Sequence, residues 1–170
     1  MLSWLQSMPD DILFIQTGGT IDKDYPHQKA GYAFSIGDSA AKKMMSKLDL
    51  SIKCHYISCT RKDSLDLTEE DRQKMVDALA QTMWQKVIIT HGTDTLQQTG
   101  RYIKDRVKNK VIILTGSMRP AAFRDSDASF NIGMAIAAAQ VLDAGVYICI
   151  HGVVKEVSDI KRDSESGKFY

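Results

Sequence analysis

Short aliphatic runs alternate with longer amphipathic stretches along the chain. The aliphatic or alternating runs lie at residues 11–16, 51–58, 86–90, 111–115 and 146–150. Helix-like patterns lie between them, at residues 38–48, from 68 to 83, 95–108 and 127–142. Strands that alternate with helices predict a parallel sheet with helices on both faces. We therefore expect an α/β fold: a three-layer, doubly wound parallel sheet of the flavodoxin-like type.

Polar stretches separate these elements at the expected ends of the strands. Residues 17–35 carry several glycines and read as a long loop, and loops of that length in a compact domain are usually functional or mobile. Residues 60–66 and 116–126 read as shorter polar loops. The segment 153–170 is polar and charged, and its pattern predicts no element.

Composition narrows the class of protein. A chain of 170 residues is most simply one domain, so we expect a single domain over 1–170. A net charge of +1 without a clustered basic surplus predicts no nucleic-acid partner, and no apolar run is long enough to predict a membrane span. Three scattered cysteines and a start that does not read as a signal peptide predict a cytoplasmic location, and the sequence has no metal-ligand spacing.

The first candidate site is the segment Thr17-Gly18-Gly19-Thr20, directly after the first aliphatic run. In open α/β sheets, ligands bind beyond the carboxyl ends of the strands. One interpretation is an ordinary glycine turn. A phosphate loop is a weaker one, because neither glycine fingerprint is complete. A third makes Thr20 a nucleophile with nearby backbone amides as oxyanion donors.

The second candidate segment, residues 91–95, follows the run at 86–90 and reads His-Gly-Thr-Asp-Thr. Asp94 could simply cap the helix that follows. The segment nevertheless supplies Thr93, Asp94 and Thr95 together, more than one cap requires. Asp94 can bind an ammonium group, and Thr93 can pass a proton.

These two segments, in this order and about 70 residues apart, resemble the two signatures of the bacterial-type L-asparaginase (asparaginase/glutaminase) family. Further resemblances lie in the Asp-Ser pair at 63–64, the Thr-Gly-Ser loop at 115–117, and Ser126-Asp127 with Asn131. The resemblance covers the family's N-terminal domain. The family has a second, smaller C-terminal domain, and we expect this chain to lack it.

The resemblance implies roles for particular residues. Thr20 matches the threonine that attacks the side-chain amide, and Gly19 lies beside it in the substrate-binding loop. Asp63 and Ser64 match residues that hold the α-groups of the amino acid. A loop tyrosine helps to activate the nucleophile; Tyr32 is the better match and Tyr25 its rival.

The second signature supplies the other half of the implied site. Thr93 matches the second threonine, and Asp94 the ligand of the substrate ammonium. The family's lysine pairs with that threonine, and Lys161 is its match here; a solvated tail lysine is the alternative. A threonine hydroxyl needs an adjacent base, which a neutral lysine or a tyrosinate-like Tyr32 would supply.

The resemblance implies an amidohydrolase that converts L-asparagine to L-aspartate and ammonia through an acyl-enzyme, without a metal or organic cofactor. Glutamine is a possible second substrate, and a homo-oligomer, dimer or tetramer, is expected. In longer relatives a neighbouring subunit completes the site. Two alternatives stay open: an amino-acid-binding sensor or inactive paralogue, and an amidase subunit that supplies ammonia to a partner.

Overall fold

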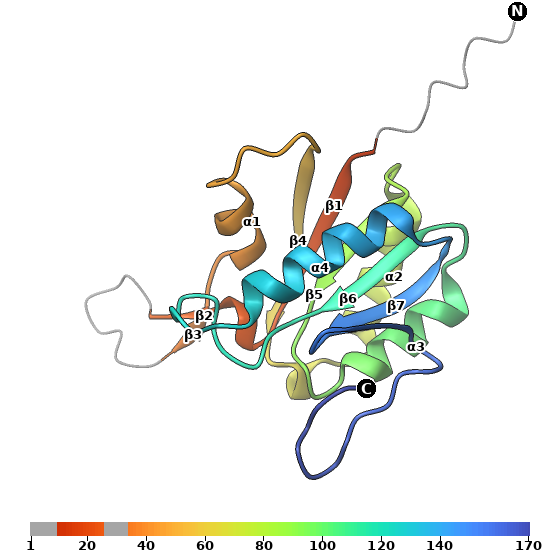
Figure 1. Ribbon diagram of the computed structural model, residues 1–170. Helices are drawn as coiled ribbons and strands as arrows, with labels where there is room; N and C mark the ends of the chain where they lie inside the picture. The colour runs from red at the N-terminus through yellow and green to blue at the C-terminus, as the bar shows by residue number, and fades with distance from the viewer. Residues whose placement is uncertain (1–9, 26–33) are drawn as a thin grey trace, which may run out of the picture.

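The computed structural model describes residues 10–25 and 34–170. These residues form one α/β unit around a six-stranded sheet with the strand order β4-β1-β5-β6-β7-β8 (Figure 1). The strands of this sheet are β1 (Ile12–Gly18), β4 (Cys54–Lys62), β5 (Lys86–Thr90), β6 (Val111–Thr115), β7 (Gly145–Ile150) and β8 (Val153–Glu156). Every neighbouring pair is parallel except β7 and β8, which form an antiparallel hairpin at one edge. The predicted doubly wound, mostly parallel sheet is confirmed.

Four helices and several short elements connect the strands. The helices are α1 (Ala40–Met45), α2 (Glu69–Gln81), α3 (Leu96–Arg106) and α4 (Ala128–Val141). The short elements are the 3-10 turns η1 (Thr20–Asp22) and η2 (Ser64–Asp66) and the antiparallel pair β2 (Lys23–Asp24) and β3 (Ser35–Ile36). The predicted loop at 17–35 thus contains η1 and β2, and its residues 26–33 lie outside the described part.

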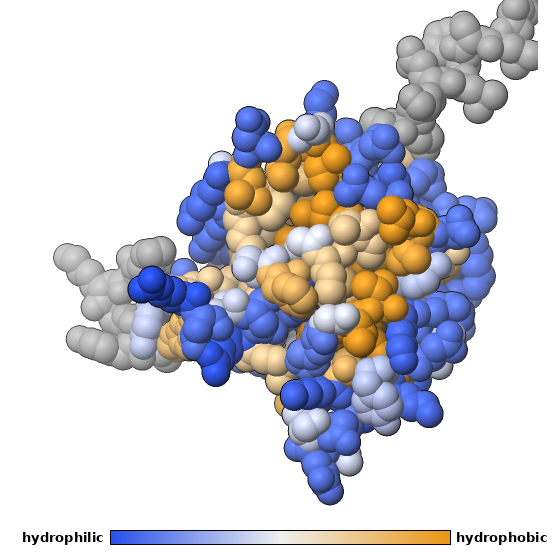
Figure 2. Space-filling model, in the orientation of Figure 1, coloured by the Kyte–Doolittle hydropathy of each residue, from blue (hydrophilic) through white to orange (hydrophobic). Residues whose placement is uncertain are grey.

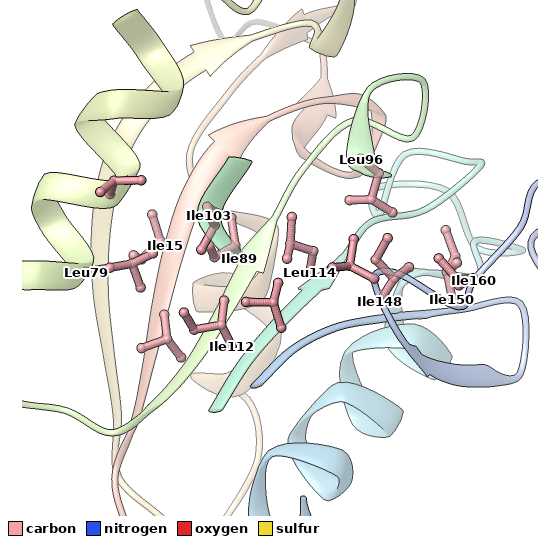
Figure 3. Packing of buried hydrophobic residues seen from close by; sticks show 14 of the residues in the cluster. Ile15, Leu79, Ile89, Leu96, Ile103, Ile112, Leu114, Ile148, Ile150 and Ile160 are labelled. Carbon is pink, nitrogen blue, oxygen red and sulfur yellow. The ribbon is translucent and has the colours of Figure 1, made fainter. Parts of the chain in front are cut away.

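Two hydrophobic clusters fill the two faces of the sheet, which makes three layers. On one face, β-strand residues such as Ile15 and Ile89 pack against Leu79 of α2 and Ile103 of α3 (Figure 3). On the other face, α1 and α4 cover a second cluster that includes Phe14. Buried aliphatic area of this kind stabilises the fold by about 25 cal/mol per Å². Figure 2 shows apolar side chains gathered where α4 crosses the sheet.

Strand β4 differs from the prediction at both ends. The alternation at 51–58 predicted a strand there and a loop at 60–66, but β4 runs from Cys54 to Lys62. A register shift explains the extension: Gln16 pairs with Ser58, whereas Gly18 pairs with Lys62. This bulge allows polar residues to continue the pairing beyond the alternating segment. The carboxyl end of β4 therefore lies directly beside the first candidate loop.

Candidate functional site

Backbone contact between two glycines joins the two candidate segments. Gly19 has a φ of 85°, and a Cβ atom built on it would lie 2.4 Å from both the N and the Cα of Gly92. Only a residue without a side chain fits such an approach. Thr20, the first residue of η1 and half-buried, is therefore held next to residues 91–93.

The end of β4 packs against the other side of the first loop. The amide of Gly19 donates a hydrogen bond of 3.0 Å to the carbonyl of Lys62. A Cβ atom on Gly18, where φ is 108°, would lie 2.4 Å from the same carbonyl oxygen. The loop after β1 is thus fixed between the ends of β4 and β5, its two neighbours in the sheet.

Ser64 reaches the second segment through similarly close packing. A Cβ atom on Gly92 would lie 2.6 Å from the Cβ of Ser64, and the Thr95 hydroxyl donates to the Ser64 carbonyl at 2.8 Å. Ser64 is 1% exposed, and its hydroxyl has no hydrogen-bond partner among residues 10–25 and 34–170. A buried hydroxyl without a partner is costly, and this one lies against the second signature segment.

Asp63 lies beside Ser64 and forms an ion pair with Lys23, with 2.8 Å between Nζ and Oδ2. The hydrogen bond from Lys23 lowers the pKa of Asp63 below its ordinary value, against a smaller opposing effect of burial. The Asp63 carboxylate is therefore ionised at neutral pH and is paired with the ammonium group of Lys23.

Asp94 and Thr93 contact Arg162 rather than Lys161. The Nη1 of Arg162 donates to the Thr93 carbonyl at 3.2 Å and lies 3.3 Å from Oδ1 of Asp94. The side chain of Lys161 is exposed and makes no hydrogen bond or ion pair within the described part of the chain. Its backbone pairs with Tyr170. The predicted partnership of Lys161 with Thr93 has no contact to support it.

Tyr32 and Tyr25 were the two candidates for the loop tyrosine. Tyr32 lies outside the described residues. Tyr25 is 56% exposed, and its ring packs on Phe34 with 4.3 Å between the centroids. Phe34 in turn contacts Phe123 edge-on. Tyr25 therefore packs in a small aromatic cluster. Its hydroxyl makes no hydrogen bond with Thr20.

His91 is a positioning residue that the sequence analysis did not assign. The ring is fully buried, and burial lowers its pKa to about 4, so the imidazole is neutral. Nδ1 lies 2.6 Å from the Gly92 carbonyl, and Nε2 lies 2.8 Å from the Thr99 hydroxyl. Because a carbonyl only accepts, Nδ1 carries the proton and Nε2 accepts from Thr99. The only signal in the sequence was a histidine directly after a buried strand.

A short chain of hydrogen bonds continues from His91 into the core. Arg72 of α2 donates from Nε to the Thr99 hydroxyl at 3.0 Å, and its Nη1 donates to the Leu67 carbonyl. Arg72 is 5% exposed, which is rare for arginine without such partners. Helices α2 and α3 thereby fix the ring that orients the backbone of Gly92.

The loop after β6 completes the edge of the site. A Cβ atom on Gly116 would lie 2.3 Å from the carbonyl oxygen of His91. Asn131 donates to the Gly116 carbonyl at 3.0 Å and to Asp127 at 2.9 Å, and Asp127 accepts from the amide of Met118. The five motif segments named in the sequence analysis thus meet at one edge of the sheet.

The described residues contain neither a cluster of metal ligands nor a membrane-spanning helix. Within residues 10–25 and 34–170, no three histidine, cysteine, aspartate or glutamate side chains lie together as a metal site would require. No helix in the same ranges combines the length and the apolar character needed to cross a membrane.

This arrangement defines a doubly wound α/β protein with a hydroxyl- and carboxylate-bearing site at the carboxyl edge of its sheet. The family profile described as "Asparaginase, N-terminal" matches residues 11–167. The chain therefore belongs to the asparaginase family, as its two signature segments predicted.

Individual relatives agree with this assignment. The glutaminase-asparaginase of Acinetobacter glutaminasificans is 30% identical over 168 residues, which cover 90% of this chain and 50% of that protein. A glutamyl-tRNA(Gln) amidotransferase subunit of Methanobrevibacter smithii is 26% identical over 151 residues, covering 86% of this chain and 34% of that protein. The chain spans about half the length, or less, of the curated relatives that it matches.

Solved structures share the fold. The thermostable L-asparaginase from Thermococcus kodakarensis superposes with a TM-score of 0.80 at 24% identity, covering 89% of this chain and 47% of that one. A probable cytoplasmic L-asparaginase from Campylobacter jejuni superposes with a TM-score of 0.76 at 22% identity, covering 94% and 52%. At these identities the likeness establishes the architecture.

Proposed function

We propose that this chain is an amidohydrolase that cleaves the side-chain carboxamide of L-asparagine, with Thr20 as nucleophile. The observation that carries the proposal is the close approach of Gly19, which precedes Thr20, to the backbone of His91 and Gly92, which precede Thr93 and Asp94. The loop that carries Thr20 thereby lies against the loop that carries Thr93 and Asp94. Effective catalysis requires such prior positioning of the reacting groups.

In the proposed reaction, the Thr20 hydroxyl adds to the amide carbon and loses its proton to a base. The tetrahedral intermediate expels the nitrogen as ammonia once that nitrogen is protonated, leaving an ester on Thr20. Water then hydrolyses the ester and releases aspartate. Tyr32, or Tyr25 in its place, is the group we propose to assist the transfer of the proton. No step requires a metal or an organic cofactor.

The amino-acid end of the substrate is held by the remaining groups in this proposal. Asp94 binds the α-ammonium through a charge-assisted contact. The unpartnered hydroxyl of Ser64 donates to the substrate, and Asp63 contributes a second carboxylate next to it. Glutamine, one methylene longer, is the second substrate to test. A homo-oligomeric assembly is part of the same proposal.

The test is ammonia release from L-asparagine and L-glutamine by wild type, Thr20→Ala and Thr20→Ser. Removing the nucleophile should lower kcat by at least about 1,000-fold, and the serine variant should recover part of the rate because it keeps a hydroxyl. Thr82→Ala, at the far end of α2, is the matched control. Wild-type turnover by Thr20→Ala would refute the assignment.

A second function is favoured by the similarity to the amidotransferase protein of Methanobrevibacter smithii, which covers 86% of this chain. In this version the same hydrolysis supplies ammonia to a partner protein. Copurification of a partner that raises the rate of ammonia release would favour it. Binding of aspartate without any turnover would instead indicate an amino-acid sensor.

A further inference from the structure

The segment 161–170, which predicted no element, forms a small hairpin against the site. Lys161 and Tyr170 exchange two backbone hydrogen bonds of 3.0 and 2.9 Å, and the amide of Asp163 donates to the Lys168 carbonyl at 2.8 Å. Phe169, opposite Arg162, is buried in the cluster beneath α2 and α3. The hairpin is therefore anchored in the core, and it presents Arg162 to the second signature.

The guanidinium of Arg162 is only partly used by its own chain. Nε donates to the Gly167 carbonyl at 2.9 Å, and Nη1 contacts Thr93 and Asp94. Nη2 has no hydrogen-bond partner among residues 10–25 and 34–170. It lies near Gly167, since a Cβ atom there would be 3.5 Å from it. Two N–H donors therefore remain for a ligand.

An open cavity of about 380 Å³ adjoins this guanidinium and is lined by Asp94, Arg162 and residues 163–167. Its volume falls in the range of small-molecule sites. The lining carries the guanidinium of Arg162 beside the carboxylate of Asp94, together with the carboxylates of Asp163 and Glu165. The Asp163 carboxylate is already used within the turn, where it accepts from the amides of Glu165 and Ser166. Opposite charges at this spacing complement a zwitterion, with the ammonium against Asp94 and the carboxylate against Arg162.

We propose that Arg162, in the place predicted for Lys161 beside Thr93, is the cationic residue of this site, and that it determines specificity for a free α-carboxylate. The proposal rests on the proposed function for the role of Asp94. Planar guanidinium donors match a carboxylate in pairs, which a lysine ammonium does not. Because a guanidinium stays protonated, Arg162 takes no proton from Thr93, and the base belongs to another loop.

The test compares binding of L-aspartate and of its α-carboxamide, which keeps the ammonium and the side chain but lacks the α-carboxylate. Calorimetry on wild type should show at least a tenfold preference for L-aspartate. Arg162→Ala should weaken L-aspartate binding tenfold to a hundredfold and leave the α-carboxamide within twofold, so that the preference disappears. Arg162→Lys should retain part of the preference.

Lys168→Ala removes a charge from the same hairpin, away from the cavity, and should behave as wild type. Equal weakening of both ligands by Arg162→Ala would assign the residue a purely structural role and overturn the proposal. So would loss of the preference in Lys161→Ala alone, or failure of wild type to bind either ligand. If Arg162→Ala does not fold, Arg162→Lys is compared with wild type instead. A reduced preference for L-aspartate over its α-carboxamide then supports the proposal, and an unchanged preference overturns it.

Ammonia release, measured on the same preparations, separates this proposal from the function. A carboxylate preference that depends on Arg162 without any ammonia release refutes the hydrolase and keeps the binding role. Ammonia release together with an unchanged carboxylate preference in Arg162→Ala keeps the hydrolase and refutes the binding role of Arg162.

Discussion

Asp22 and Asp71 are almost equally buried, at 3% and 2% exposure, yet their pKa values move in opposite directions. Burial raises the pKa of Asp22 to about 6, against the opposing hydrogen bond from the Ala40 amide. Burial also acts to raise the pKa of Asp71, but hydrogen bonds from Lys62 and Thr68 outweigh it and bring the value to about 2. Burial alone therefore does not decide the charge of a carboxylate; the donors around it do.

The donors differ clearly between the two places. Asp71 accepts from Lys62 at 2.7 Å and from both the amide and the hydroxyl of Thr68 at 3.0 Å, which closes a capping box on α2. Asp22 accepts from Ala40 at 2.8 Å, and its Oδ2 has no partner among the described residues. Both carboxylates support the first loop: Asp22 follows Thr20 in η1, and the carbonyl of Lys62 contacts Gly19.

The same substitution at the two positions should therefore have opposite effects on stability. Asp71→Asn should lower the free energy of unfolding at pH 7 by about 2–3 kcal/mol, since each pKa unit corresponds to about 1.4 kcal/mol. The folded pKa of about 2 lies below the ordinary 3.8, so the carboxylate stabilises the fold above pH 3.8 and loses this effect as the pH falls through 2. Urea unfolding at pH 7 and near pH 2 measures it; an equal difference at both pH values would contradict the explanation.

Asp22→Asn should stabilise the chain at pH 8, by up to about 3 kcal/mol. Here the folded pKa of about 6 lies above 3.8, so the folded state binds the proton more tightly. The carboxyl costs nothing below pH 3.8, and its cost grows as the pH rises to 6 and is then constant. The unfolding curves of wild type and variant should therefore coincide near pH 3.5, separate progressively between pH 3.8 and 6, and keep a constant separation above pH 6. A destabilised variant at pH 8 would refute the difference between the two sites.

Thr68→Ala should have the smallest effect, a loss of about 1 kcal/mol in the free energy of unfolding. It removes the cap of α2 and one of the donors to Asp71 while leaving Lys62 in place. The titration of Asp71, followed by NMR, should then move toward its ordinary value. An unchanged pKa would mean that Lys62 and the backbone amide of residue 68 account for the lowered value without the hydroxyl.

The elements best predicted from the sequence are the strands that are covered by helices on both faces of the sheet. Strands β5 and β6 have the predicted ends, because continuous aliphatic runs such as 111–115 leave no alternative. The end of β4 was missed, because an exposed edge strand with polar residues 60–62 carries no periodic signal. For similar reasons, the hairpin 161–170 depends on long-range burial of Phe169, which local pattern does not reveal.

The same physical limit applies to the site. Two loops after parallel strands had to meet at one edge of the sheet, so the proximity of residues 17–20 to residues 91–95 could be anticipated. Lys161 and Arg162 are adjacent in a hairpin, where neighbouring side chains point to opposite sides. The register of that hairpin therefore decides which of the two reaches Asp94, and the local sequence does not reveal the register. The roles of His91, Thr99 and Arg72 depend on helices that local pattern does not place in space.

The contact between Gly19 and Gly92 has a consequence for how this protein can change. The two positions are 73 residues apart in the chain, yet neither has room for a single methyl group. In a library randomised at both codons and selected for folded protein, we expect glycine to return at each position independently of the other. At Gly19 the added atom would meet only the backbone of His91 and Gly92, so no smaller side chain elsewhere can compensate for it. At Gly92 it would meet the side chain of Ser64, so only a smaller residue at position 64 could make room.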